Sequence, residues 1–300
     1  MESMATAPSP DLTFSTDLVE ALLAAQSPAL AELPVTWFGS GWDNELFRLG
    51  DSMLVRLPRR ESAVALITNE IEHLPLIGSL VTMPVPQPVF AGTPSDLFPH
   101  PWTIVPFVAG TPASALPVAE RAAFAEQLAD LLWTVHVPAP GHAPINPVRG
   151  GSLARPEPDA QARARLATVP DADALLARWE AWTAAPDFDD VDLWIHGDAH
   201  PHNMIIGEDG QIASLVDWGD LTAGDPACDL ATAWLTFDDE GRRIFRERTD
   251  LGRPLDEATW TRAKAWALHL GLILATQTDD QPALNAIGHH ALAELLREPV

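Results

Sequence analysis

Three short apolar runs, each the length of a β-strand, surround one polar loop between residues 193 and 216 of this 300-residue chain. A turn with Gly207 and Gly210 separates the second run from the third, and the loop at 196–203 separates the first two. Short apolar runs bounded by turn residues are typical of strands. We therefore expect a strand, a polar loop and a hairpin, with strands at 193–195, 204–206 and 212–216.

Asp198, Asn203 and Asp217 have defined places in this pattern. Asp198 and Asn203 lie five residues apart on the loop, which Pro201 turns, and Asp217 follows the third run. In kinases a loop Asp orients the attacking hydroxyl, while an Asn five positions on and an Asp on the next strand hold Mg²⁺ at the nucleotide phosphates. The spacing predicts a phosphoryl-transfer site with Asp198 as the catalytic residue and with Asn203 and Asp217 as Mg²⁺ ligands.

The segments HGDAHPHN at 196–203 and LVDWGDLTAGDPACDLATAW at 215–234 resemble the aminoglycoside phosphotransferase family, to which macrolide phosphotransferases are related. These proteins are small-molecule kinases with a fold similar to that of protein kinases. The resemblance implies an α+β, protein-kinase-like fold of two lobes. It places a small antiparallel-sheet lobe that binds the nucleotide at 1–108. A mainly helical lobe with the catalytic loop and the acceptor site follows at 109–300.

The resemblance extends upstream to a nucleotide loop and a third strand, GSGWDN at 39–44 and MLVRLPR at 53–59. It implies that the loop covers the phosphates of ATP or GTP and that the chain near 105–108 meets the base. It also implies that Arg56 contacts the phosphates while Glu70 holds it. The expected nucleotide-binding residues are Ser40, Gly41, Asn44, Arg56, Glu70, Val105 and Phe107.

The sequence departs from the family at two positions. Arg56 stands where the third strand normally has Lys, and the one Lys of the chain is Lys264. Arg binds phosphate bidentately, although a solvated strand residue would also fit the sequence. His202 stands where the family usually has Gly. We expect the His202 side chain to point to solvent, with contact to the substrate as the alternative.

Two other functions are alternatives to a kinase. A zinc hydrolase would use the alternating loop residues His196, Asp198, His200 and His202. In an extended segment, however, such alternation directs side chains to opposite faces, and the resemblance implies that His196 supports the loop. The other alternative is a nucleotide-binding protein without turnover. The presence of all three kinase-type residues argues against it.

The chain is strongly acidic, because 42 acidic and 18 basic residues give a formal net charge of -24. Between Arg178 and Arg242 there is no Lys or Arg. Such a field repels nucleic acid and attracts Mg²⁺ and cationic molecules, although an acidic proteome would produce the same charge. We expect no nucleic-acid partner and a small cationic acceptor, foremost an aminoglycoside. A macrolide, another antibiotic and a metabolic alcohol are the alternatives.

The single cysteine, Cys228, cannot form an internal disulfide, which is typical of a reducing compartment. The N-terminus lacks a basic segment followed by an apolar core, and no apolar run approaches the roughly 18 residues of a membrane span. We therefore expect a cytoplasmic protein without a membrane partner.

Periodicity and capping residues predict the remaining elements. In the first lobe we expect a helix from Ser15 or Thr16 to 32, a helix at 61–77, and strands at 35–38, 45–49, 53–57, 88–91 and 102–108. In the second lobe we expect helices at 118–137, 163–182, 239–249, 256–277 and 283–297.

The sequence leaves the role of several residues open. The segment 138–158, which contains Arg149 and Arg155, is either a connector or a flap over the substrate. Asp225 and Asp229 adjoin a Gly-Pro turn, so we expect structural roles such as helix capping, and the resemblance implies that this segment braces the catalytic loop. Residues that either line the acceptor pocket or belong to the core or surface are Trp260, Trp266, His269, Asp279 and Asp280.

Overall fold

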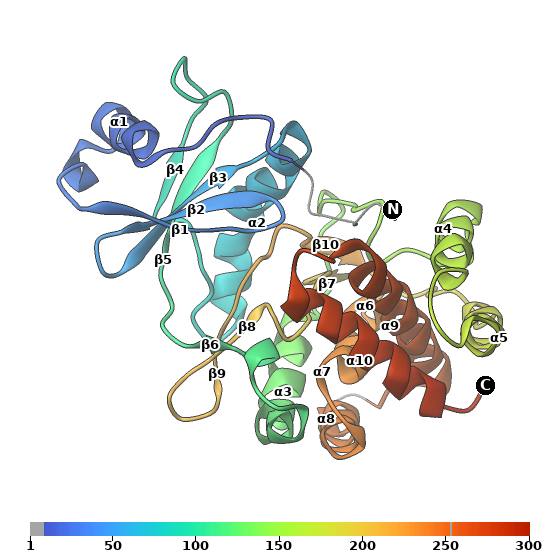
Figure 1. The fold of residues 1–300 in the computed structure, drawn as a ribbon. Helices are drawn as coiled ribbons and strands as arrows, with labels where there is room; N and C mark the ends of the chain where they lie inside the picture. The colour runs from blue at the N-terminus through green and yellow to red at the C-terminus, as the bar shows by residue number, and fades with distance from the viewer. Residues whose placement is uncertain (1–8, 253) are drawn as a thin grey trace. The chain divides into compact units, whose positions relative to one another are not determined.

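The computed structural model describes residues 9–252 and 254–300, which form two compact units (Figure 1). The first unit contains residues 9–109, and the second begins at Gly110. An antiparallel sheet dominates the first unit, and helices dominate the second. The predicted α+β class is therefore confirmed.

The sheet of the first unit is antiparallel throughout and has the strand order β1-β2-β3-β5-β4. Phe47, Val55 and Ile104 lie opposite one another on neighbouring strands and enter the same hydrophobic core. This ladder of apolar side chains fixes the register of the sheet. The strands, all close to their predicted positions, are β1 (Val35–Ser40), β2 (Asn44–Leu49), β3 (Met53–Pro58), β4 (Phe90–Gly92) and β5 (Trp102–Pro106).

Two helices accompany this sheet. Helix α1 (Thr16–Gln26) begins where predicted, because Leu18 N donates a hydrogen bond to Ser15 Oγ at 3.1 Å. It ends at Gln26 and not at 32, since Pro28 opens a 3-10 turn and has no N–H for a helical hydrogen bond. Helix α2 (Val64–Leu80) follows a short 3-10 turn.

Two small sheets carry the loops of the second unit. Strand β7 (Leu193–Ile195) pairs with β10 (Thr222–Gly224), and the other sheet has the order β6-β8-β9. Its strands are β6 (Thr111–Pro112), β8 (Met204–Ile206) and β9 (Ile212–Leu215). The predicted strand, loop and hairpin at 193–216 are thus confirmed.

Helix α9 (Glu257–Gln277) is the centre of the helical part, because α4, α5, α6, α7 and α10 all pack against it. The three predicted C-terminal helices are confirmed as α8, α9 and α10. The other helices of the unit are α3 (Ala125–Val135), α4 (Pro156–Leu166), α5 (Ala172–Thr183), α6 (Ala227–Leu230), α7 (Thr232–Thr236), α8 (Asp239–Gly252) and α10 (Pro282–Arg297).

Two predicted helices of the second unit differ from the structure. The helix expected at 163–182 is two helices, α4 and α5, because Pro170 and the left-handed Asp171, with φ 56°, interrupt it. The helix expected at 118–137 begins as a 3-10 helix at Val118–Phe124 before α3. Within the described residues, no helix combines the length and the hydropathy that crossing a membrane would require.

Candidate active site

Arg56 on β3 and Glu70 on α2 form the central polar pair of the first unit. Arg56 Nη2 donates to Glu70 Oε1 at 3.0 Å, and Nη1 contacts the other carboxylate oxygen. Both residues are buried, and Glu70 is 0% exposed. The interpretation of Arg56 as a solvated strand residue is therefore wrong. The pair holds the guanidinium at a fixed place on the sheet.

The loop between β1 and β2 contains three predicted nucleotide-binding residues. Gly41 N donates to Asn44 O at 2.8 Å, and Ser40 Oγ donates to the Glu45 carboxylate at 2.8 Å. Arg59, which follows β3, closes the loop because its Nη1 donates to Gly41 O at 2.7 Å. Among the described residues, buried Asn44 Oδ1 has no hydrogen-bond donor. The loop is thus ordered by its own contacts while one acceptor stays unused.

Val105 and Phe107 lie at the end of β5 and just beyond it. Val105 is buried, whereas Phe107 N donates to Ser52 O at 2.8 Å. The Arg48 guanidinium lies 3.6 Å from the centre of the Phe107 ring, which is a cation–π contact. The structure therefore fixes the backbone of the segment that the resemblance assigns to the nucleotide base.

On the second unit, Asp229 of α6 fixes the start of the polar loop. Its carboxylate accepts hydrogen bonds from His196 N and Gly197 N, both at 2.8 Å, and lies 2.9 Å from His136 Nε2. Burial alone would raise the pKa of Asp229, but the hydrogen bond and charge of His136 and the charge of His196 outweigh it and lower this pKa. Asp229 is thus structural, as expected: it braces the loop, as the resemblance implies, and does not cap a helix.

His196 supports the same loop from within the core. It is fully buried, its Nε2 lies 3.1 Å from Val216 O, and its ring centre lies 4.5 Å from that of Trp218. His202 lies 2.9 Å from Ser114 Oγ through Nδ1, so the expectation that it points to solvent is wrong. These two histidines therefore have protein partners in different directions, which does not suit a shared zinc ion.

Asp198 lies among three polar side chains. Its Oδ2 lies 3.3 Å from His200 Nε2 and accepts a hydrogen bond from Asn203 Nδ2 at 3.3 Å. Its Oδ1 lies 3.5 Å from Arg149 Nη2. Burial would raise the pKa of Asp198, but the charges and hydrogen bonds of His200 and Arg149 outweigh it and lower the pKa. Asp198 is therefore an anion that can accept a hydrogen bond from a bound hydroxyl.

Asp217 follows β9 in the left-handed backbone region, with φ 62°. Among the described residues, Asp171 is the only other non-glycine residue with positive φ. Such a conformation costs about 1 kcal/mol and is enriched at functional sites. The neighbouring Val216 N donates to Asn203 O at 2.9 Å, and the Asp217 charge contributes to raising the pKa of His200. Asp198, Asn203 and Asp217 are therefore close together, as the spacing predicted.

The donor atoms of Asn203 and Asp217 suit Mg²⁺. Asn203 Nδ2 donates to Asp198 O at 3.0 Å, which leaves the amide oxygen as the atom available to a cation. Carboxylate and amide oxygens are ligands that Mg²⁺ prefers, with water and nucleotide phosphates completing its shell. In the described part of the chain, no group of three or more His, Cys, Asp or Glu residues forms a metal cage. Asn203 Oδ1 and the Asp217 carboxylate are thus the oxygens at this loop that could hold a cation.

The sequence does not predict that Arg149 lies beside Asp198, or that Asp220 holds Arg149 there. Arg149 Nη2 lies 3.1 Å from Asp220 Oδ2 and 3.5 Å from Asp198 Oδ1. Arg149 belongs to the long loop that precedes α4, and no motif in the sequence links this loop to Asp198. Arg149 comes close to Asp198 because its loop forms hydrogen bonds with β10 and the residue after it. The periodicity of the sequence does not reveal this contact.

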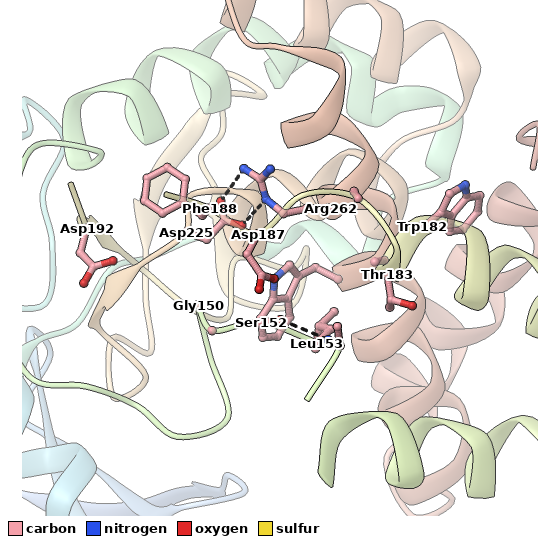
Figure 2. A pocket seen from close by; sticks show the side chains of 15 residues that line it. Gly150, Ser152, Leu153, Trp182, Thr183, Asp187, Phe188, Asp192, Asp225 and Arg262 are labelled. Atoms are coloured by element: carbon pink, nitrogen blue, oxygen red, sulfur yellow. Dashed lines mark hydrogen bonds and ion pairs between the residues drawn. The ribbon is translucent and has the colours of Figure 1, made fainter. Parts of the chain in front are cut away.

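A cavity of about 260 Å³ lies beside this loop in the second unit (Figure 2). Its lining includes Gly150, Ser152 and the Asp225–Arg262 ion pair, and the additional carboxylates of Asp187 and Asp192 give it a net negative charge. Of the aromatic residues considered for an acceptor pocket, Trp266 lines this cavity. The other two belong to the core: Trp260 packs near Trp234 and Phe245, and His269 stacks near Trp179.

Comparison with known proteins agrees with this geometry. The family model of the phosphotransferase enzyme family matches residues 35–266. The uncharacterized protein YcbJ of Bacillus subtilis (strain 168) is 27% identical over 207 residues, which are 60% of this chain and 62% of that protein. The chain therefore spans less than two thirds of the length of this curated relative.

Solved structures share the fold. The GDP and kanamycin complex of APH(2″)-IIia is 18% identical with a TM-score of 0.68, over 92% of this chain and 97% of that one. Macrolide 2′-phosphotransferase MphH from Brachybacterium faecium is 21% identical with a TM-score of 0.62, over 95% and 98%. The predicted kinase-like fold is confirmed. Because the family model covers most of its length, the chain belongs to the phosphotransferase enzyme family.

Proposed function

We propose that this protein transfers the γ-phosphoryl group of ATP or GTP to a hydroxyl group of a small molecule in a Mg²⁺-dependent reaction. The observation that carries the proposal is the Asp198 carboxylate, held beside Asn203 on a loop that Asp229 fixes. A charged acceptor of hydrogen bonds next to a metal-ligating amide is the arrangement that phosphoryl transfer needs.

Asp198 orients the acceptor hydroxyl for attack. The hydroxyl oxygen forms a bond to the γ-phosphorus while the bond to the β-phosphate oxygen breaks, and the nucleoside diphosphate leaves. Asp198 also accepts the hydroxyl proton as the new bond forms. Its two contributions are therefore orientation of the hydroxyl and removal of its proton.

Asn203 and Asp217 would hold Mg²⁺ through their side-chain oxygens. When bound, Mg²⁺ supplies positive charge that neutralises the nucleotide phosphates. The left-handed backbone of Asp217 supports this role, because strain of this kind persists where the position of a side chain matters.

The first unit binds the nucleotide. Arg56 provides a fixed guanidinium for the phosphates, and Glu70 keeps it in place. The loop with Ser40, Gly41 and Asn44 covers the phosphates. The unused Asn44 Oδ1 supports a ligand contact there, since buried acceptors normally have a donor. The segment with Val105 and Phe107 contacts the base.

The acceptor is an aminoglycoside in the first instance. The absence of Lys and Arg between Arg178 and Arg242, and the acidic cavity of Figure 2, favour a cationic molecule. One structure with the same fold binds kanamycin, whereas another is a macrolide phosphotransferase, so a macrolide is the second candidate. Cys228, the single cysteine, supports a cytoplasmic location.

The test is acceptor-stimulated release of ADP or GDP in the presence of Mg²⁺. The acceptors are kanamycin, gentamicin, streptomycin, a macrolide and simple amino alcohols. The inactive control is Asp217→Asn, because Asn tolerates positive φ but lacks the anionic ligand. The matched active control is Asp173→Asn, at an exposed position of α5. Nucleotide binding without turnover on any acceptor would favour a binding protein, and turnover that persists without Mg²⁺ would contradict the mechanism.

A further inference from the structure

Arg149 lies between the proposed catalytic residue and a second carboxylate. Its Nη2 is 3.5 Å from Asp198 Oδ1 and 3.1 Å from Asp220 Oδ2, and its side chain is only 14% exposed. Nη1 donates to Val148 O at 3.2 Å. One guanidinium therefore lies between two carboxylates of like charge and reduces their repulsion.

The segment that carries Arg149 is anchored independently of its guanidinium. Asn146 N donates to Thr222 Oγ1 at 2.8 Å, and Asn146 Nδ2 donates to Asp220 Oδ1 at 2.7 Å. Asp225 N donates to Gly150 O at 2.9 Å, so the segment runs beside β10. Asp220 is thus held through both oxygens, and Arg149 is presented from an ordered backbone.

Gly150 is required for this close approach. Its φ is +67°, and a Cβ atom there would lie 2.8 Å from Ile195 Cδ1 and 3.2 Å from Gly224 Cα. A side chain at this position would push the segment away from β7 and β10. Since β7 leads directly into the polar loop, Gly150 brings the preceding residue, Arg149, to Asp198.

We propose that Arg149 is a positioning residue for phosphoryl transfer, which fixes the orientation of the Asp198 carboxylate toward the acceptor hydroxyl. His200 and Asn203 hold Oδ2, whereas Arg149 approaches Oδ1 from the other side. Contacts on both oxygens restrict rotation of the carboxylate. This inference rests on the proposed function, because it assigns a role only if Asp198 orients an acceptor.

Loss of the guanidinium would leave Asp198 with partners on Oδ2 alone, His200 and Asn203, and would remove the positive charge between Asp198 and Asp220. Their repulsion would turn Asp198 away, while Asn146 and Gly150 would still hold the segment. A Lys at this position would restore the charge, but its ammonium lies on a flexible four-carbon stem, whereas Nη2 of the rigid guanidinium contacts both carboxylates. The expected defect is therefore in the rate of transfer and not in the fold or in nucleotide binding.

The experiment compares Arg149→Ala and Arg149→Lys with Arg155→Ala in steady-state kinetics. The acceptor is the one of the panel above that gives the highest turnover. Arg155 is the matched control, because it is exposed on the same segment and donates to the carbonyls of Ser152 and Pro147. We expect kcat to fall roughly 100-fold in Arg149→Ala and about tenfold in Arg149→Lys, with the KM for nucleotide unchanged.

Added guanidinium ion distinguishes positioning from structure. It should raise kcat of Arg149→Ala about fivefold or more, because the ion can occupy the space of the missing group, while Na⁺ at equal ionic strength should not. A structural role alone would lower the melting temperature and show no rescue. If Arg149→Ala does not fold, Arg149→Lys decides by its loss of kcat at an unchanged melting temperature.

The failures of the two proposals are distinguishable. Normal turnover of the unaltered protein together with an unchanged kcat in Arg149→Ala would overturn this inference alone. An equal loss in Arg155→Ala would also overturn it, because the order of the segment would then explain the defect. No acceptor-stimulated turnover in the unaltered protein would overturn the proposed function and this inference with it.

Discussion

Arg56 and Glu70 form a buried, bidentate ion pair that joins strand β3 to helix α2. Glu70 lies on the buried face of α2, together with the apolar residues Ile67 and Leu74. A buried carboxylate is tolerated only with a partner, and the planar guanidinium matches both of its oxygens. The pair therefore makes the orientation of Arg56 part of the packing of the first unit.

Glu70→Gln should destabilise the protein by about 3 kcal/mol, because it leaves a buried guanidinium without its counter-charge. Urea unfolding at neutral pH measures the effect. The control is Glu72→Gln, since Glu72 lies two residues away on the same helix with a side chain that is 66% exposed. Equal stability of the two variants would show that the pair contributes nothing to the fold.

The double variant Arg56→Met with Glu70→Leu separates stability from nucleotide binding. Replacement of a buried ion pair by apolar side chains of similar volume often leaves stability unchanged. The free energy of unfolding should therefore lie within about 1 kcal/mol of that of the unaltered protein. Nucleotide affinity, measured by calorimetry, should be lower than that of the unaltered protein, because the guanidinium proposed to contact the phosphates is absent. Restored affinity in this variant would contradict the role proposed for Arg56.

Asp198→Asn should lower kcat by about 10² to 10⁴-fold while nucleotide affinity stays within a factor of about two. The amide keeps the size of the side chain but can neither take the proton nor orient a hydroxyl as an anion does. Phosphoryl transfer to the preferred acceptor and calorimetric nucleotide binding provide the two readouts. Activity equal to that of the Asp173→Asn control would contradict the mechanism.

The strands and the catalytic loop could be predicted because their information is local. Short apolar runs mark β7, β8 and β9, and a fixed spacing of five residues relates Asp198 to Asn203. The end of α1 and the break between α4 and α5 were missed although Pro28 and Pro170 mark both. In these helices a continued apolar periodicity suggested more residues than the backbone can accommodate.

The contacts between distant segments could not be predicted. Arg149 meets Asp198 only because its segment lies beside β10, and nothing in the local sequence encodes that pairing. His269 is a polar aromatic residue of the kind that often lines a pocket. Helix α9 is surrounded by other helices, however, so His269 is buried in the core. Burial of this kind depends on how several helices pack, which a single amphipathic pattern does not specify.

Asp229 should make the protein sensitive to acid. Its folded-state pKa lies below the unfolded value of about 3.9, so its contribution is complete above about pH 4 and is lost as the pH falls through the folded pKa. Asp229→Asn should lower stability at neutral pH by about 3 kcal/mol, and the difference from the unaltered protein should shrink in acid. Unfolding followed by circular dichroism against pH measures this. A difference that is constant down to the acid transition would contradict the assignment.

His269 should produce a second pH dependence, at higher pH. Burial, followed by the charges of Arg149 and Arg165, lowers its pKa to about 3, whereas the unfolded chain binds this proton near pH 6.5. Between these values the unfolded state carries more protons, so stability falls as the pH decreases, by about 2 kcal/mol between pH 7 and pH 5. His269→Phe keeps a ring to stack near Trp179 and should make this slope shallower, while His196 and His290, whose pKa values burial also lowers, keep their part of it. His289→Phe, at an exposed position of α10, should leave the slope unchanged. Urea unfolding at the two pH values gives the free energy of unfolding of each variant. An equal change in this free energy between pH 7 and pH 5 for the unaltered protein and His269→Phe would mean that His269 is protonated in the folded state.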